Sequence, residues 1–204
     1  MQTKRIEIEE KILKTAKKVF LEKGMAGARM QDIADRANIN KSLIHYYFKD
    51  KHSLFKLVFN QVFSIIAPQI NEIINNDFSV EDKIRKFTYN YYDFRQEHPH
   101  LSNFVINELN VNPDFFETLT CHPLFPNIDK FKAQVRREVN QGILVPIDGE
   151  QLFIHIISLN IFPFMAAPLI QRFMDSDNKH YQAILNSRKT EVADFIINSI
   201  TRKI

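Results

Sequence analysis

Five hydrogen-bond donors follow one another near the N-terminus, and no acidic residue stands among them. They are Lys41, Ser42, His45, Tyr46 and Lys49. Ile44, Tyr47 and Phe48 form an apolar stripe at helical spacing, so the donors fall on the opposite, outward side. A helix on a solvated surface usually carries some Asp or Glu, whereas a helix that meets phosphates and base edges needs donors. The segment 41–48 is therefore predicted to enter the major groove of DNA.

A second short helix must hold this one in place. Ile33, Ala34 and Ala37 give the segment 30–37 a small apolar face, and residues 38–40 join the two segments. Asn38 tolerates the left-handed backbone of a sharp turn, and Asn40 can cap a helix that begins at Lys41. Together the segments predict a helix-turn-helix over about 29–48. An ordinary buried helix pair with a mildly basic rim is the alternative interpretation.

Longer apolar patterns flank the motif. Apolar residues three and four apart predict one helix from Thr3 to Lys23, which Gly24 ends, and another from Lys51, which Pro68 limits. Residues 1–52 hold twelve Lys or Arg and seven Asp or Glu, a net charge of +5, whereas the whole chain carries +3. The positive excess thus lies on the predicted DNA-binding unit, as phosphate binding requires.

At these residues the chain resembles the TetR family of bacterial transcription regulators. The matching residues are Gly24, Gln31-Asp-Ile-Ala34, Ala37, Ile39-Asn-Lys41, Ile44, Tyr47-Phe48 and Lys51–Leu54. Arg29 stands where many members have a capping Thr, and Asn38 stands where they usually have Gly. The resemblance implies an all-α protein. A three-helix helix-turn-helix DNA-binding domain over 1–50 would precede a larger helical ligand-binding and dimerisation domain over 51–204.

The motif, followed residue by residue, implies nine residues that contact DNA. Those placed to meet base edges are Lys41, Ser42 and Leu43. Those expected at phosphates, or in positioning the helix, are Arg29, Gln31, His45, Tyr46, Tyr47 and Lys51. Tyr47 could instead pack inward beside Phe48.

Two long helices are predicted at the C-terminal end, over 149–173 and 181–202. The resemblance implies a homodimer through these two helices, and two-fold symmetry then implies a palindromic double-stranded DNA operator. A monomer in which both helices fold back on one core is the alternative. The stretch 152–170 carries no charged residue, but His155, Pro163 and Pro168 favour a helix buried by protein on both sides over a membrane span.

Aromatic residues are frequent among the middle helices. The resemblance implies a ligand cavity there, which would take a small hydrophobic effector. The candidate lining residues are Phe87, Tyr91, Phe94, Phe104, Glu108, Phe131, Phe153, Ile157, Asn160 and Phe164. Tyr91, Glu108, Asn160 and His155 are candidate polar anchors. For each Phe, plain core packing is the alternative.

Composition and motifs argue against an enzyme or a secreted protein. Cys121 is the only cysteine, so no intramolecular disulfide can form, and the chain start has no apolar signal core; both fit the cytoplasm. His98-Pro-His100 and Cys121-His122 lack the repeated spacing of a zinc site, and neither a metal nor a cofactor is predicted. We therefore predict a ligand-responsive transcription regulator, most simply a repressor. A DNA-binding or partner-binding protein of the same fold without an effector is the alternative.

Overall fold

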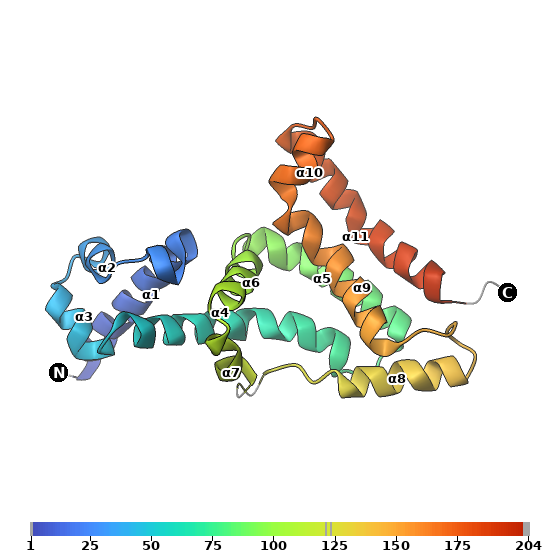
Figure 1. The fold of residues 1–204 in the computed structure, drawn as a ribbon, viewed down its shortest axis with the longest axis horizontal. Helices are drawn as coiled ribbons and strands as arrows, with labels where there is room; N and C mark the ends of the chain where they lie inside the picture. The colour runs from blue at the N-terminus through green and yellow to red at the C-terminus, as the bar shows by residue number, and fades with distance from the viewer. Residues whose placement is uncertain (1, 121, 123, 202–204) are drawn as a thin grey trace. The chain divides into compact units, whose positions relative to one another are not determined.

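The computed structural model describes residues 2–120, 122 and 124–201, and these residues form helices joined by short connections (Figure 1). Within this part of the chain, β pairing is limited to one isolated bridge between Leu144 and Thr201. The all-α fold class is therefore confirmed. Cys121 and Arg202, on which two predictions fall, lie outside the described residues.

Two compact units divide the chain. Unit 1 comprises the described residues up to Ile66 together with His100–Phe125. Its helices are α1 (Gln2–Gly27), α2 (Met30–Ala37), α3 (Lys41–Phe48), the first part of α4 (Lys51–Ile74), α6 (Leu101–Val111) and α7 (Asp114–Thr120). The grouping follows contacts and not chain order, since α6 and α7 join the helices of the motif. The functional boundary predicted near residue 50 stays a prediction.

Aromatic side chains form the centre of unit 1. The ring of Phe55 on α4 lies 4.9 Å from that of Phe20 on α1, 5.9 Å from Phe104 on α6 and 4.9 Å from Phe115 on α7. All four side chains are buried. Each buried aromatic side chain contributes about 1.5–3 kcal/mol of hydrophobic stabilisation, so this cluster ties α4, α6 and α7 to the first helix.

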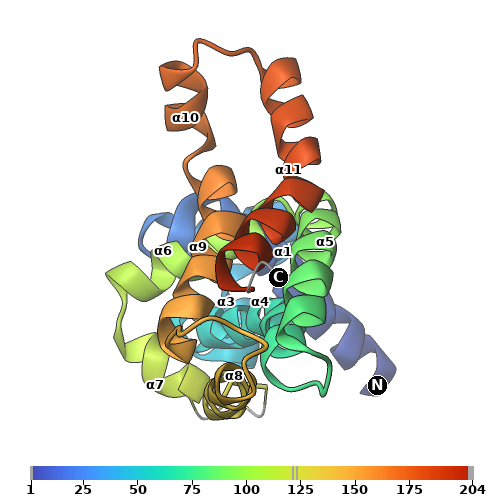
Figure 2. The same cartoon turned by 90° about the vertical axis from the view of Figure 1, so that its right-hand side faces the viewer.

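Unit 2 comprises Ala67–Pro99 and the described residues from Pro126 onward. Its helices are the end of α4, α5 (Val80–Glu97), α8 (Asp129–Asn140), α9 (Gly149–Met165), α10 (Ala167–Phe173) and α11 (Asn178–Ile200). In Figure 2, α10 and the start of α11 run side by side at the top of the view.

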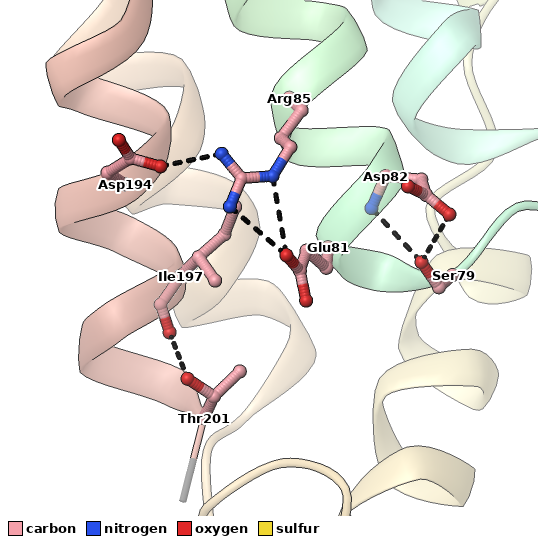
Figure 3. Close-up of polar contacts among 7 residues, drawn as sticks. All are labelled: Ser79, Glu81, Asp82, Arg85, Asp194, Ile197 and Thr201. Carbon is pink, nitrogen blue, oxygen red and sulfur yellow. Dashed lines mark hydrogen bonds and ion pairs between the residues drawn. The ribbon is translucent and has the colours of Figure 1, made fainter. Parts of the chain in front are cut away.

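Ion pairs fix the register of α5 against α11. The guanidinium of Arg85 lies between Glu81, at 3.1 Å, and Asp194 on α11, at 2.6 Å (Figure 3). Farther along α5, Asp93 accepts a hydrogen bond from Lys189 at 2.6 Å. As residue numbers rise along α5 they fall along α11, so the two helices are antiparallel.

Four helix boundaries differ from the predictions. α1 has a break at Gly24 but resumes and ends at Gly27, and α4 runs through Pro68 to Ile74. The helix predicted over 149–173 is broken at Ala166 into α9 and α10, which are bent by 77°. Asp177 caps α11 through a hydrogen bond from the His180 N–H at 2.7 Å, so that helix begins earlier than predicted.

One helix among the described residues, α4, is long and apolar enough to cross a membrane by length and composition alone. The bent pair α9 and α10 passes the same test only if it counts as one span. Core helices pass such tests too. The prediction that the stretch 152–170 is buried on both sides is wrong for the single chain, because Ile154, Phe162 and Leu169 are more than half exposed.

Candidate nucleic-acid interface

α3 presents one polar side to solvent and one apolar side to unit 1. Ile44 and Phe48 are 0% and 4% exposed, whereas Tyr46 is 73% exposed. The other exposed side chains of the helix and its end are Lys41, Ser42, His45 and Lys49. Leu43 and Tyr47 are half-buried at the edge between the two sides. The donors named from the sequence therefore share one accessible flank, and their contact with DNA stays a prediction.

The turn before α3 has the backbone that its sequence predicts. Asn38 lies in the left-handed region at φ 50° and ψ 55°, and its N–H caps α2. Asn40 precedes α3, and its side chain accepts a hydrogen bond from the Ser42 N–H at 2.9 Å. α3 consequently begins at Lys41 and ends at Phe48, as predicted.

Ion pairs hold α2 on α1. Lys23 donates to Asp32 at 2.5 Å, and Arg36 donates to Glu22 at 2.6 Å. The hydrogen bond from Lys23 lowers the pKa of the Asp32 carboxyl below its ordinary value. Asp32 therefore stays ionised, and its charge is neutralised locally so that it does not oppose an approaching phosphate.

The chain leaves α3 through a tight turn centred on Lys49. Its φ of 58° and ψ of −63° are rare for a residue with a side chain, and the Asp50 N–H donates to the Phe48 carbonyl at 2.5 Å. The next residue, Asp50, caps α4 by accepting from the Ser53 N–H at 2.7 Å. This bond lowers the pKa of Asp50. The turn sets how closely α4 follows α3.

The remaining predicted phosphate contacts lie on either side of α3. Arg29 is exposed at the residue before α2, where its side chain makes no capping hydrogen bond. Gln31 is exposed and donates to Asp35 at 2.7 Å. The ring of the half-buried Tyr47 lies 6.2 Å from that of Phe48, and the Arg5 guanidinium lies 6.0 Å above it. Arg5 is not among the residues that the sequence predicts to contact DNA.

Lys51 has a structural contact that no local sequence pattern predicts. Its ammonium donates to the Met25 carbonyl at 2.9 Å and to the Ala28 carbonyl at 3.1 Å. Because Asp50 already occupies the start of α4, a phosphate there meets a carboxylate as well as free N–H groups. Lys51 thus ties α4 to the end of α1, and its contact with phosphate stays a prediction.

A carboxylate from α6 closes the break in α1. Gly24 adopts φ 65° and ψ 177°, and Glu108 accepts a hydrogen bond from the next N–H, that of Met25, at 3.0 Å. The second oxygen of Glu108 accepts from Asn112 at 3.0 Å. A Cβ at Gly24 would lie 2.7 Å from Glu108 Oε1, so only glycine leaves room for this contact.

The candidate pocket residues fall in both units. Phe104 and Glu108 belong to unit 1, where Phe104 packs in the aromatic core and Glu108 holds α1. The others lie in unit 2, on α5, α8 and α9: Phe87, Tyr91, Phe94, Phe131, Phe153, Ile157, Asn160 and Phe164. Their role as a ligand lining stays a prediction.

Ring contacts divide the unit 2 candidates into two aromatic groups. The Tyr91 ring lies 5.5 Å from that of Phe87, 6.2 Å from Phe94 and 6.0 Å from Phe164. Phe131 and Phe153 form a separate pair at 6.3 Å. Within the described residues, no group of three or more His, Cys, Asp or Glu could hold a metal ion.

An exposed donor flank on the second helix of a helix-turn-helix, within an all-α chain, defines a DNA-binding protein of the transcription-regulator class. The family described as "Bacterial regulatory proteins, tetR family" matches residues 12–58, which include α2 and α3. This match confirms the resemblance to the TetR family over the N-terminal part of the chain.

Relatives and solved structures agree with this assignment. The chain is similar to the HTH-type transcriptional regulator RutR of Escherichia coli strain K12, with 29% identity over 71% of this chain and 68% of RutR. It is also similar to the probable HTH-type transcriptional regulator YttP of Bacillus subtilis strain 168, with 19% identity over 83% of each chain. The fold resembles that of the TetR-family regulator HI0893 from Haemophilus influenzae, with a TM-score of 0.63, 19% identity and coverage of 97% and 98%. These relatives are regulators and not enzymes, and regulators of the family bind DNA and act as dimers.

Proposed function

We propose that this protein is a ligand-responsive repressor that binds a palindromic operator as a homodimer in the cytoplasm. The observation that carries the proposal is the accessible flank of α3, in which five donors lie together without an acidic residue. Two copies related by a two-fold axis would place two such helices in successive major grooves, about 34 Å or a multiple of it apart.

Exposed apolar side chains on the last helices support dimerisation through them. Ile154, Phe162 and Phe195 are between 52% and 67% exposed, and Phe173 at the end of α10 is 80% exposed. A cleft of about 350 Å³ between α9 and α11 is lined by Leu152, Leu159, Ile196 and Ile200, among others. Apolar surface of this kind favours a second copy as its cover.

Size-exclusion chromatography with light scattering tests this interface. Phe195→Asp should shift the dimer toward monomer, because the carboxylate would be buried without a partner. Phe116→Asp is the matched control, since Phe116 is a 52% exposed Phe on α7 in unit 1. If the dimers of both variants dissociate equally, or if neither dimer dissociates, the proposed interface is wrong.

Selection of DNA fragments by the purified protein tests the operator. We expect two half-sites in inverted repeat. Lys41→Ala should relax the preference at one base pair by about 1–3 kcal/mol, because Lys41 is placed at a base edge. Tyr46→Ala should weaken binding to all sequences alike, whereas Tyr89→Ala, at a 53% exposed Tyr on α5, should not. An unchanged sequence preference in Lys41→Ala would remove its base-reading role.

We further propose that a small hydrophobic effector releases the operator. α4 supports this mechanism because the single helix begins beside α3 and continues from unit 1 into unit 2. A ligand that moves α4 would change the spacing of the two recognition helices. To move the equilibrium from 1% to 99% released, it must favour the released state by about 5.5 kcal/mol.

The alternative, a regulator of the same fold without an effector, predicts a different response of operator binding to added compounds. No compound would then change the operator affinity, although the unliganded dimer would still bind.

A further inference from the structure

Arg95 on α5 is a buried cation without an acidic partner. The residue is 8% exposed, and its guanidinium lies 5.0 Å above the ring of Phe164 on α9. Nη1 donates to the Pro99 carbonyl, while Nε has no hydrogen-bond partner among the described residues. Burial lowers the pKa of Arg95, but a guanidinium remains charged in proteins. A charge removed from water in this way is costly unless a partner compensates it.

A second guanidinium lies on the facing helix. Arg188 on α11 is half-buried; its Nη2 donates to the Leu159 carbonyl at 2.8 Å, and its Nε also has no partner in the described structure. The antiparallel register set by Asp93 and Lys189 puts Arg188 level with Phe94, next to Arg95 along α5. Burial raises the pKa of the Tyr92 phenol, and the charge of Arg188 opposes part of that rise. Arg188 therefore lies close to Tyr92, and Arg95 follows Tyr92 by three residues on the same helix.

An apolar wall around Phe164 lies against Arg95 and Tyr92. Phe164 packs at 5.0 Å from Tyr92 and at 6.0 Å from Tyr91. Together with Ala167 and Ile170 it covers a buried cluster of Tyr92, Tyr181 and Leu185. Phe164 and Ala167 are only half-buried, because they flank the bend between α9 and α10. The wall is thus apolar, with a partly open side at that bend.

A purely structural role leaves the Nε donor of each guanidinium unexplained. Each guanidinium uses one nitrogen to satisfy a backbone carbonyl, which a Lys ammonium could also do. The planar group of Arg matters where two parallel donors meet a planar acceptor. Neither Arg95 nor Arg188 forms an ion pair with a carboxylate among the described residues.

We propose that Arg95 and Arg188 bind the carboxylate of a small organic acid whose apolar part lies against Phe164 and Tyr92. A carboxylate is planar, matches the edge of a guanidinium and brings a single negative charge into an apolar site. The inference rests on the proposed function in that this acid is the effector. It gives the small hydrophobic effector expected from the sequence a carboxylate group.

Thermal unfolding of the full-length protein tests this site with three probes that share one alkyl chain. The probes are octanoate, octan-1-ol and octyl phosphate, each at matched ionic strength. Octanoate should raise the midpoint with concentration, as a ligand bound only by the folded protein does, and octan-1-ol should not. Stabilisation by octyl phosphate alone would overturn the carboxylate assignment, and equal stabilisation by octan-1-ol would overturn the anionic site.

Variants separate binding from folding. Arg95→Gln and Arg188→Gln should each weaken octanoate about tenfold or more, because a charge-assisted pair is lost. Arg95→Lys and Arg188→Lys keep a charge and one donor for the carbonyl. They should fold like the native chain and still bind octanoate more weakly. Arg136→Gln, at an exposed Arg on α8, is the control. Undiminished octanoate binding in both Lys variants contradicts the proposal.

Operator binding is also measured without any probe, so that a failure of the acid site and a failure of the proposed function can be told apart. A protein that binds its operator as a dimer but is not stabilised by octanoate rejects the acid site alone. A protein that is stabilised by octanoate but binds no DNA rejects the proposed function alone.

Discussion

Replacement of Gly24 by Ala is the sharpest test of how unit 1 is assembled. Gly24 adopts φ 65° and ψ 177°, a region that residues with a Cβ almost never occupy. The new Cβ would also lie 2.7 Å from Glu108 Oε1, which is closer than real Cβ contacts come. Either the backbone or the carboxylate must then move, and the structure of α1 at its break depends on both groups.

The size of the effect follows from these two terms. Forcing Ala into this backbone region costs about 1–3 kcal/mol. Displacing the carboxylate removes its hydrogen bond from the Met25 N–H, and such bonds to a charged acceptor contribute about 1.5–3 kcal/mol. We expect a loss of about 3–5 kcal/mol, a large part of the total of about 5–15 kcal/mol for a typical domain.

Urea unfolding followed by circular dichroism measures this loss, and Gly142→Ala is the control. Gly142 also has a positive φ, 72°, but a Cβ there meets no atom within 4 Å, so only a backbone cost of about 1–2 kcal/mol applies. Adding Glu108→Ala to Gly24→Ala should cost less than the two single changes summed, since the clash is removed. If Gly24→Ala cost no more than Gly142→Ala, the role of Glu108 in closing α1 would be wrong.

Four further changes test separate contacts. Lys49→Gly should raise the free energy of unfolding by about 1 kcal/mol, because it relieves a positive φ, yet weaken operator binding; a less stable variant would contradict the strain. Asn38→Ala should cost about 1 kcal/mol by urea unfolding and Asn38→Gly close to nothing, and equal costs would deny the left-handed turn. Burial lowers the pKa of Lys83, so the folded chain gives up this proton at a lower pH than the unfolded chain, whose Lys has the ordinary pKa of 10.5. The free energy of unfolding of the native chain, relative to that of Lys83→Met, should therefore rise with pH up to about 10.5. A constant difference between about pH 8 and 10.5 would contradict this. Tyr181→Phe should lower the thermal midpoint through the loss of about 1 kcal/mol, because the Tyr181 hydroxyl donates to the Pro163 carbonyl at 2.6 Å.

The helix-turn-helix could be predicted closely because its signals are local. Asn40 caps α3 two residues away, and Asn38 forms the turn by its own backbone preference. The apolar stripe of Ile44 and Phe48 decides which side of α3 is buried. Each of these features acts within one or two helical turns, so a single sequence contains the information.

The contacts that hold this motif in unit 1 could not be predicted in the same way. Lys51 reaches Met25 across 26 residues, and Glu108 reaches the same residue across 83. Glu108 was expected to be a polar anchor for a ligand, yet both of its oxygens are occupied in unit 1. A pattern along the chain shows that such a residue is polar within an apolar helix, but it does not show which partner it meets.

Proline at residue 68 was expected to limit α4, but the helix continues for another six residues. A proline inside a helix costs about 3 kcal/mol. The residues around it compensate this cost, since Ala67, Ile73 and Ile74 are at most 1% exposed while Pro68 itself is exposed. Burial of the neighbouring turns therefore outweighs the missing hydrogen bond.

The two prolines near the end of α9 show what decides the outcome. Pro163 lacks an N–H, so the Leu159 carbonyl four residues earlier has no helical donor, and Arg188 on α11 donates to it at 2.8 Å. The helix thus passes through Pro163. It breaks at Ala166, and Pro168 lies in the first turn of α10, where a proline costs little. Whether a proline is tolerated depends on a donor from another helix, which no local pattern reveals. Because Arg188 needs only Nη2 for this purpose, its Nε remains available for the proposed acid.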